Sequence, residues 1–217
     1  MAHALINLHT AVIARGQHAW AYIKTTATEQ RLLRRLSVFA EGWTLDEMET
    51  MCYTLRERSR ALDELTSLAE KGLVRLVGAG ERYFLLETIR SFAGEALADS
   101  EETDNIRDAH ADVFLAVAQA INAGIKGGGQ LDAMQRARSE SANMQAAIYW
   151  YTERARVQSR QPTVAAVGDG GAVEQGLILC GSLNWVWHIS GQHFTARDAI
   201  DALMPMAATR APSMASC

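Results

Sequence analysis

Arginine side chains gather in one part of the sequence, and the guanidinium group is well suited to contacting phosphate oxygens. Six of them lie close together along the chain: Arg31, Arg34, Arg35, Arg56, Arg58 and Arg60. On a shared face they could bind a nucleic-acid backbone. The alternative is a solvated surface with salt bridges. Asp63, Glu64 and Glu70 follow closely, so a helix there would be repelled in part by phosphates. DNA contact is therefore the second interpretation of the cluster.

Aromatic side chains form a second candidate site further along the chain. Tyr149, Trp150 and Tyr151 are consecutive, and Trp185 and Trp187 stand two residues apart. Core packing between helices explains such residues in most proteins. A concave groove for a ligand or peptide, lined by Trp150, Trp185 and Trp187, is the alternative, because aromatic rings supply large contact areas.

No arrangement of residues resembles a catalytic, metal or cofactor site. His188 and His193 are five residues apart on either side of a glycine, so they do not share a helix face as zinc ligands do. Cys52, Cys180 and Cys217 are far apart and form no C-x-x-C pair. We expect the first two to be core residues. The sequence thus predicts no catalytic residue, no metal, no cofactor and no enzymatic activity.

Composition is that of an ordinary globular protein. Apolar residues make up 48% of the 217 residues and charged residues 21%. The net charge of −4 argues against attraction of the whole chain to nucleic acid or to anionic membranes. No signal peptide is visible, and no run approaches the roughly 18 apolar residues of a membrane span. We therefore expect a cytoplasmic protein with no membrane partner.

The segment 28–100 begins with two predicted helices. Thr28 is a plausible N-cap for the first, and Gly42 is expected to end it. Thr44 starts the second, with Glu47 at the capping-box position. Both helices carry apolar residues at helical spacing, so each should bury one face.

The rest of this segment has the order of a winged helix. A third helix should run from Ser59 to Gly72, two β-type runs at 73–77 and 82–86 flank a glycine-rich turn, and a fourth helix follows at about 87–98. The apolar residues of the third helix that are expected to face the core are Leu62, Leu65, Leu68 and Ala69. In a winged helix the third helix reads DNA and the hairpin is the wing. Residues 28–100 are therefore interpreted as a winged-helix-like domain.

Residues 101–217 show helical periodicity only. A long helix should end at Gly127-Gly128-Gly129, and another should cover 130–154. Residues 155–175 lose periodicity and collect Ser, Gln, Pro and Gly, which predicts a flexible loop.

Two further helices are predicted at 174–189 and 194–208, separated by Gly191. Antiparallel helical pairs of this kind are typical of tetratricopeptide-like repeats. Residues 1–27 are expected to form a short N-terminal helical segment. The predicted fold class is mostly α: a winged-helix unit of three to four helices and a two-stranded hairpin, followed by repeat-type helical pairs.

Two blocks of sequence resemble a known family. The blocks Leu36-Ser-Val-Phe-Ala and Leu85-Leu-Glu-Thr-Ile-Arg are similar to the winged-helix region of bacterial STAND-type regulatory ATPases, which include LuxR-type and SARP-type transcriptional regulators. The resemblance covers about 28–154, and 176–204 more loosely. It implies a winged helix that acts as a structural switch packed on an ATPase domain, followed by helical repeats.

The chain departs from that family in what it lacks. Family members carry a phosphate loop of the form G-x-x-x-x-G-K-[ST], whereas the glycines at 78–80 and 127–129 have no following Lys-Ser/Thr pair. No LuxR-type DNA-binding domain follows either. The resemblance therefore implies a fragment or reduced relative whose partner is a protein or an upstream ATPase domain. Our first interpretation is a non-catalytic regulatory module, the second is a small DNA-binding regulator, and the third is an enzyme or ligand-binding protein of unrecognised type.

Overall fold

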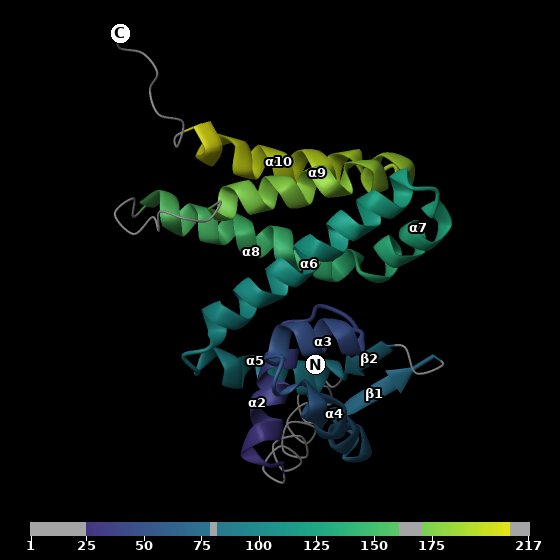
Figure 1. Cartoon of the computed structure of the whole chain (residues 1–217). Helices are drawn as coiled ribbons and strands as arrows, with labels where there is room; N and C mark the ends of the chain where they lie inside the picture. The colour runs from purple at the N-terminus through teal and green to yellow at the C-terminus, as the bar shows by residue number, and fades with distance from the viewer. Residues whose placement is uncertain (1–24, 79–81, 161–170, 209–217) are drawn as a thin grey trace, which may run out of the picture. The chain divides into compact units, whose positions relative to one another are not determined.

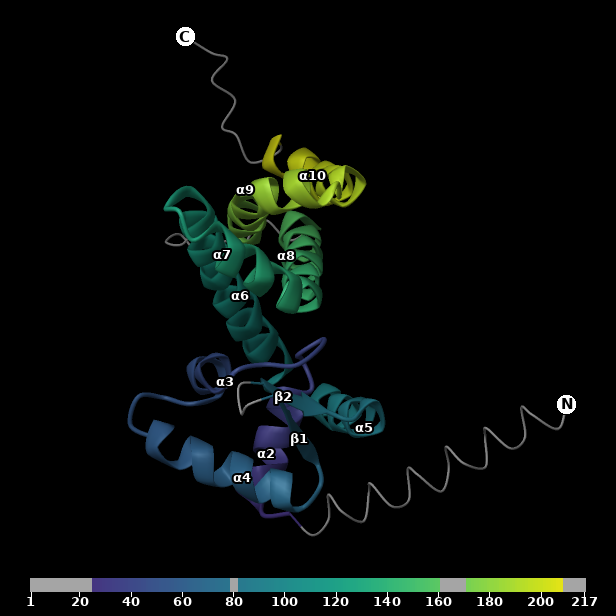
Figure 2. The ribbon, with the colours of Figure 1, turned by 90° about the vertical axis from the view of Figure 1, so that its right-hand side faces the viewer.

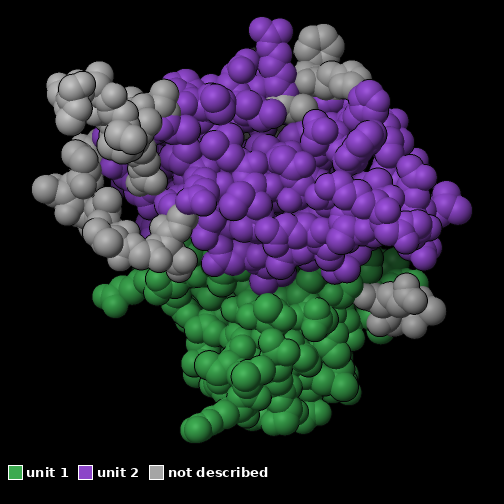
Figure 3. All heavy atoms as spheres, turned by 45° about the horizontal axis from the view of Figure 1, so that its top comes forward, with its two compact units in different colours: residues 1–109 green, residues 110–217 purple. Residues whose placement is uncertain are grey.

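The computed structural model describes residues 25–78, 82–160 and 171–208 (Figure 1). It is mostly α-helical, with one two-stranded antiparallel sheet among the described residues, which confirms the expected fold class. The chain divides into two compact units, residues 1–109 and 110–217, coloured separately in Figure 3. Most of the predicted N-terminal segment 1–27 lies outside the described residues.

Helix α2 (Ala27–Leu36) begins with a capping box. Thr26 is the N-cap: its hydroxyl accepts a hydrogen bond from the Glu29 amide at 3.3 Å, and its own amide donates to the Glu29 carboxylate at 2.7 Å. The prediction of Thr28 as the N-cap is therefore wrong, because the helix is capped two residues earlier. The helix also ends at Leu36, well before the predicted stop at Gly42.

Gly42 serves close packing rather than helix termination. A Cβ atom at this position would lie 2.5 Å from the ring of Phe84 and 2.8 Å from the carbonyl oxygen of Tyr83. The next residue, Trp43, exchanges backbone hydrogen bonds with Tyr83 at 2.8 and 3.0 Å. Its buried ring stacks on Phe39, with ring centroids 5.1 Å apart. Glycine is needed here because the hairpin docks against this backbone.

The next helices follow the prediction closely. Helix α3 (Leu45–Cys52) has the expected capping box, formed by Thr44 and Glu47. A short 3-10 helix (Arg58–Arg60) leads directly into α4 (Ala61–Glu70), the third helix of the winged-helix order. Gly72, at φ +69°, ends α4 in the left-handed conformation that favours glycine.

The hairpin and the helix after it complete the unit. Strand β1 (Val74–Val77) pairs antiparallel with β2 (Arg82–Leu85), with Val74 opposite Leu85, and α5 (Glu87–Ala98) packs against α2. The winged-helix order predicted from the sequence is therefore confirmed.

Helix α6 (Thr103–Lys126) runs through the boundary between the two compact units. After it, the single helix predicted over 130–154 is wrong. The structure has two helices, α7 (Gln130–Ser139) and α8 (Ser141–Arg160), which are separated at Glu140.

The predicted loop 155–175 is helical at both ends. Helix α8 continues to Arg160, and α9 (Ala172–Ser190) begins three residues before the predicted end of the loop. Residues 161–170 lie outside the described part of the chain. Gly191, at φ +71°, ends α9 as predicted, and α10 (His193–Ala208) follows.

The last three helices of the second unit pack together. Figures 1 and 2 show α8, α9 and α10 side by side, with successive helices antiparallel. Gly176 allows the close approach, because a Cβ atom there would lie 2.9 Å from Leu203 on α10 and 3.2 Å from Tyr151 on α8. Within the described residues, no helix combines the length and the apolar character needed to cross a membrane.

Candidate functional site

Two of the six arginines serve a structural ion pair. Arg35 donates to the Glu102 carboxylate at 2.6 and 2.9 Å, and Arg34 donates to the same group at 3.2 Å. Arg35 also donates to the backbone carbonyl of Cys52 at 2.7 Å. Burial alone would raise the pKa of Glu102, but the two guanidinium groups outweigh it and hold that pKa below its ordinary value. These arginines tie α2 to the start of α6.

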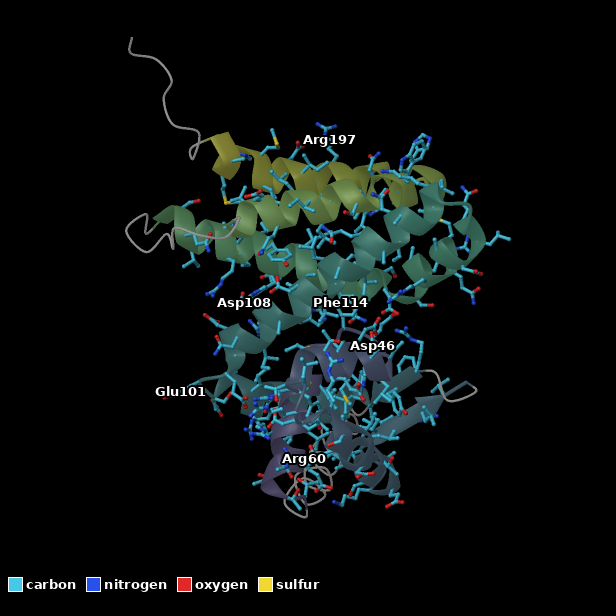
Figure 4. All side chains as sticks on the ribbon, in the orientation of Figure 1. Asp46, Arg60, Glu101, Asp108, Phe114 and Arg197 are labelled. Carbon is cyan, nitrogen blue, oxygen red and sulfur yellow. The ribbon has the colours of Figure 1, made fainter. Side chains whose placement is uncertain are left out.

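The three later arginines lie in the segment between α3 and α4. Arg56 is exposed, Arg58 donates to the Thr50 hydroxyl at 3.4 Å, and Arg60 is 3.5 Å from the Glu57 carboxylate. Figure 4 labels Arg60, the residue immediately before α4. The arginine cluster is therefore divided. Arg34 and Arg35 pair with Glu102 inside the unit, whereas the later arginines lie on a separate surface segment.

Arg31 lines a small hollow beside α2 together with Cys52, Tyr53 and Glu64. The Tyr53 hydroxyl donates to Glu64 at 2.7 Å, and burial together with this bond raises the pKa of Tyr53. Burial also raises the pKa of the Cys52 thiol to about 12, so the thiol stays protonated. The hollow thus contains no reactive nucleophile at neutral pH.

The exposed face of α4 is acidic and apolar. Leu65 and Leu68 are buried as expected, but Leu62 is 49% exposed, so the prediction that it faces the core is wrong. Asp63 and Glu70 are exposed on the same helix. A helix that enters a DNA groove with these carboxylates would bring them close to phosphates.

Lys71, the basic residue directly after α4, already has a partner within the unit. The Lys71 ammonium group donates to the buried carboxylate of Glu29, which also accepts from the Ser67 hydroxyl and the Thr26 amide, both at 2.7 Å. Burial would raise the pKa of Glu29, but the hydrogen bonds from Lys71, Ser67 and Thr26 lower it to about 2. This cluster is not among the sites predicted from the sequence, although the Thr-x-x-Glu spacing at its centre can be read there.

The described part of the wing exposes both apolar and basic side chains. Leu76 is 50% exposed and Val77 49%, beside the exposed Arg75. Arg82 donates to the carbonyl of Gly42 at 2.7 Å. Residues 25–109 contain 11 Lys or Arg against 17 Asp or Glu, so the unit as a whole is acidic.

The three tryptophans of the second candidate site do not line one groove. Trp187 is buried at 5% exposure, whereas Trp185, two residues earlier on the other side of α9, is 46% exposed. Trp150 is half-buried, with the guanidinium carbon of Arg154 5.6 Å from its ring centroid. Core packing therefore accounts for Trp187 only.

Three buried polar residues meet in the second unit. The Asn143 amide donates to the Glu140 carboxylate at 3.3 Å, and Asn143 also hydrogen-bonds to His110. Burial lowers the pKa of His110 to about 4 against the opposing effect of Asn143, and the imidazole lies 4.7 Å from the Phe114 ring. Within the residues that the structure describes, no group of His, Cys, Asp and Glu is arranged to hold a metal ion.

Comparison with known proteins finds relatives among transcriptional regulators. The chain is 34% identical over 146 residues to proteins named as HTH-type transcriptional regulators from Mycobacterium bovis and from two strains of Mycobacterium tuberculosis. No family model and no solved structure matches. The resemblance to STAND-type ATPases and the tetratricopeptide-like repeats therefore stay predictions. The match covers 66% of this chain and 16% of each relative, so the chain is similar to a small part of proteins named as regulators of transcription.

Proposed function

We propose that this chain is a regulatory part of a transcriptional regulator, and that its winged-helix unit works by binding protein rather than DNA. The similarity to proteins named as transcriptional regulators supports the first half of the proposal. The second half rests on the exposed face of α4, which presents the carboxylates of Asp63 and Glu70 where a DNA-reading helix would need neutral or basic groups.

The distribution of basic residues supports the same conclusion. Arg34, Arg35 and Lys71 are engaged by Glu102 and Glu29. If these side chains contacted phosphates instead, their partly buried ion pairs would break. The carboxylates of Glu102 and Glu29 would then lose their partners, which costs free energy. A protein partner that presents basic and apolar side chains would suit the exposed face of α4 and the exposed Leu76 and Val77 of β1 much better.

Direct DNA binding is the second candidate function. The relatives' names describe HTH-type regulators, and this favours DNA binding more directly than it favours an ATPase-derived module. The exposed side chains of Arg56, Arg60 and Arg75 would supply the phosphate contacts. The names apply to whole proteins, however, of which the match covers 16%.

Fluorescence anisotropy with a labelled 30-base-pair duplex separates the two candidates. We expect the full chain to show no saturable binding at low salt. Saturable binding that weakens with salt and is lost in an Arg56→Ala/Arg58→Ala/Arg60→Ala variant would establish the second candidate instead. Circular dichroism of the variant shows whether its fold is retained.

We also propose that the chain acts without catalysis. The sequence contains no phosphate loop, and the hollow beside Cys52 holds a thiol whose pKa is raised to about 12. The purified chain should hydrolyse neither ATP nor GTP above the rate of a buffer blank. Hydrolysis that is abolished by a substitution within residues 25–208 would contradict this proposal.

A further inference from the structure

Helix α9 has an exposed apolar face that nothing in the described chain covers. Of its 19 residues only Glu174 carries a formal charge, and a helix with so little charge is normally buried on all sides. Ile178 is nevertheless 41% exposed, Trp185 46% and Ile189 47%. Their spacing of seven and then four residues places them on one face of the helix.

A partly apolar face of α10 continues this surface. Ile200 is 37% exposed and Met204 51%, and with Ala207 they follow one face of α10 at intervals of four and three residues. The exposed Arg197, three residues before Ile200, lies on the same face. Ala207 and Ile178 line the same hollow, so the two stripes adjoin along the antiparallel pair. We call this surface the α9–α10 face and define it by Ile178, Gly181, Trp185, Ile189, Ile200 and Met204.

Gly181 lies in the middle of this face without an internal reason for being glycine. A Cβ atom at Gly176 would collide with Leu203, which explains that glycine. At Gly181 a Cβ atom would meet nothing within 4 Å, although glycine weakens a helix interior relative to alanine. An exposed glycine one turn from an exposed tryptophan forms a shallow depression beside a large apolar projection.

We propose that the α9–α10 face is an interface between two copies of this chain, with the two α9 helices packed antiparallel about a twofold axis near Leu183. That axis places Trp185 of each copy over Gly181 of the other. The exposed indole ring of one copy thus fits into the space left by the missing side chain of the other. The match is self-complementary, as a twofold interface requires. The proposal goes beyond the proposed function and does not depend on it.

Charge favours the antiparallel over the parallel orientation of the two copies. The antiparallel pairing brings Glu174 of one copy to the neutral Gln192 of the other, whereas a parallel pairing would bring the two Glu174 carboxylates together. Arg197 and Asp201 of α10 lie 3.3 Å apart and are largely exposed, and Figure 4 shows Arg197 pointing away from the helices of its own unit.

The stripe from Ile178 to Ile189 is about 16 Å long at 1.5 Å per residue. A stripe this short belongs with small, weak interfaces, so we expect the two copies to associate only as the protein concentration rises.

Sedimentation velocity of the full chain tests the proposal, at concentrations from about 1 to 200 µM. We expect a monomer that becomes a dimer as concentration rises. An Ile178→Asp/Trp185→Asp variant should stay monomeric throughout. The matched control is Leu131→Asp on α7, because Leu131 is an 87% exposed apolar residue of the same unit outside the face, and it should dimerise like the wild type.

Gly181→Leu tests the packing without endangering the fold. A Cβ atom at position 181 meets nothing within 4 Å in the single copy, the position is exposed, and leucine strengthens a helix, so the thermal midpoint of dilute protein should rise. The leucine should also block Trp185 of the other copy and weaken dimerisation at least tenfold. A wild type that stays monomeric at 200 µM, or a dimer that is unaffected by Gly181→Leu, would overturn the proposal.

Discussion

Glu29 connects the start of α2 to the end of α4 in the winged-helix unit. Its carboxylate completes the capping box of α2 and holds Ser67 and Lys71 at the end of α4. The same contact decides the function of Lys71, because an ammonium group paired with a buried carboxylate is not available to a phosphate. One residue thus links helix initiation, helix packing and the charge of the surface.

Replacing Glu29 should test this link. Glu29→Gln keeps the shape but leaves Lys71 without an anionic partner, and we expect it to lower the free energy of unfolding by about 2 kcal/mol. Glu41→Gln is the matched control, because Glu41 is an exposed glutamate of the same unit and its loss should cost less than about 0.5 kcal/mol. Urea denaturation followed by circular dichroism gives both values. Equal losses in the two variants would show that Glu29 is not the anchor.

Acid should destabilise the fold in two steps, with His110 responsible for the first. Its pKa is about 4 in the folded chain against an ordinary 6.5, so the unfolded chain takes up a proton between these values while the folded chain does not. Stability should therefore fall as pH drops from 6.5 to 4, by up to about 3 kcal/mol. His110→Gln should remove most of this dependence, as measured by urea denaturation at pH 7, 5.5 and 4. A variant with the full wild-type pH dependence would be inconsistent with a buried neutral His110.

Glu29 should be responsible for the second step. Its pKa is about 2 in the folded chain against an ordinary 4.5, so its stabilising effect is complete above pH 4.5 and is lost as pH falls through 4.5 toward 2. The loss between pH 4.5 and 3 should be present in wild type and His110→Gln alike, and reduced in Glu29→Gln. If Glu29→Gln loses stability over this range as steeply as wild type, the assignment is wrong.

At the residue scale, sequence spacing found local contacts and missed distant ones. The capping box of Thr44 and Glu47 was predictable because three residues separate its partners. The pairing of Arg34 and Arg35 with Glu102 joins residues more than 60 positions apart, and no local pattern marks it. For the same reason the arginines looked like one cluster in the sequence, although the fold uses two of them internally.

At the scale of elements, the hairpin depends on one close approach. Gly42→Ala would place a methyl group 2.5 Å from the Phe84 ring, and we expect it to cost about 2 kcal/mol because β2 must move away. Gly94→Ala is the control: its methyl group would meet Ser37 at an ordinary 3.8 Å inside α5, so helix propensity should make it neutral or stabilising by up to about 1 kcal/mol. Thermal unfolding compares the two, and a Gly42→Ala chain as stable as Gly94→Ala would contradict the close packing.

Elements with strong periodicity and clear end signals were predictable, and those without end signals were not. The bounds of the two strands came close to the prediction because Gly72 and the glycine-rich turn at 78–80 mark them, and α5 begins directly after the second β-type run. The break between α7 and α8 falls at Glu140, with no glycine or proline nearby, so periodicity alone merged the two helices. Leu62 was placed in the core by helical spacing, but spacing does not show how wide the covered face of a helix is.

At the scale of the whole molecule, charge separates the two parts of the chain. Residues 25–109 carry an excess of acidic groups, 17 against 11 basic, whereas residues 110–217 carry eight of each. The acidic winged-helix unit suits a basic protein surface, and the neutral second unit carries the apolar α9–α10 face.

The salt dependence of DNA binding tests the central claim most directly, measured side by side for the wild type and for Asp63→Lys/Glu70→Lys. If the acidic face of α4 is what prevents DNA binding, the wild type should show no saturable binding at low salt. The variant, with four units of charge reversed on that face, should bind with a log–log salt slope of about −2. A wild type that binds as tightly as the variant, with an equally steep slope, would contradict the claim and make the chain a DNA-binding regulator.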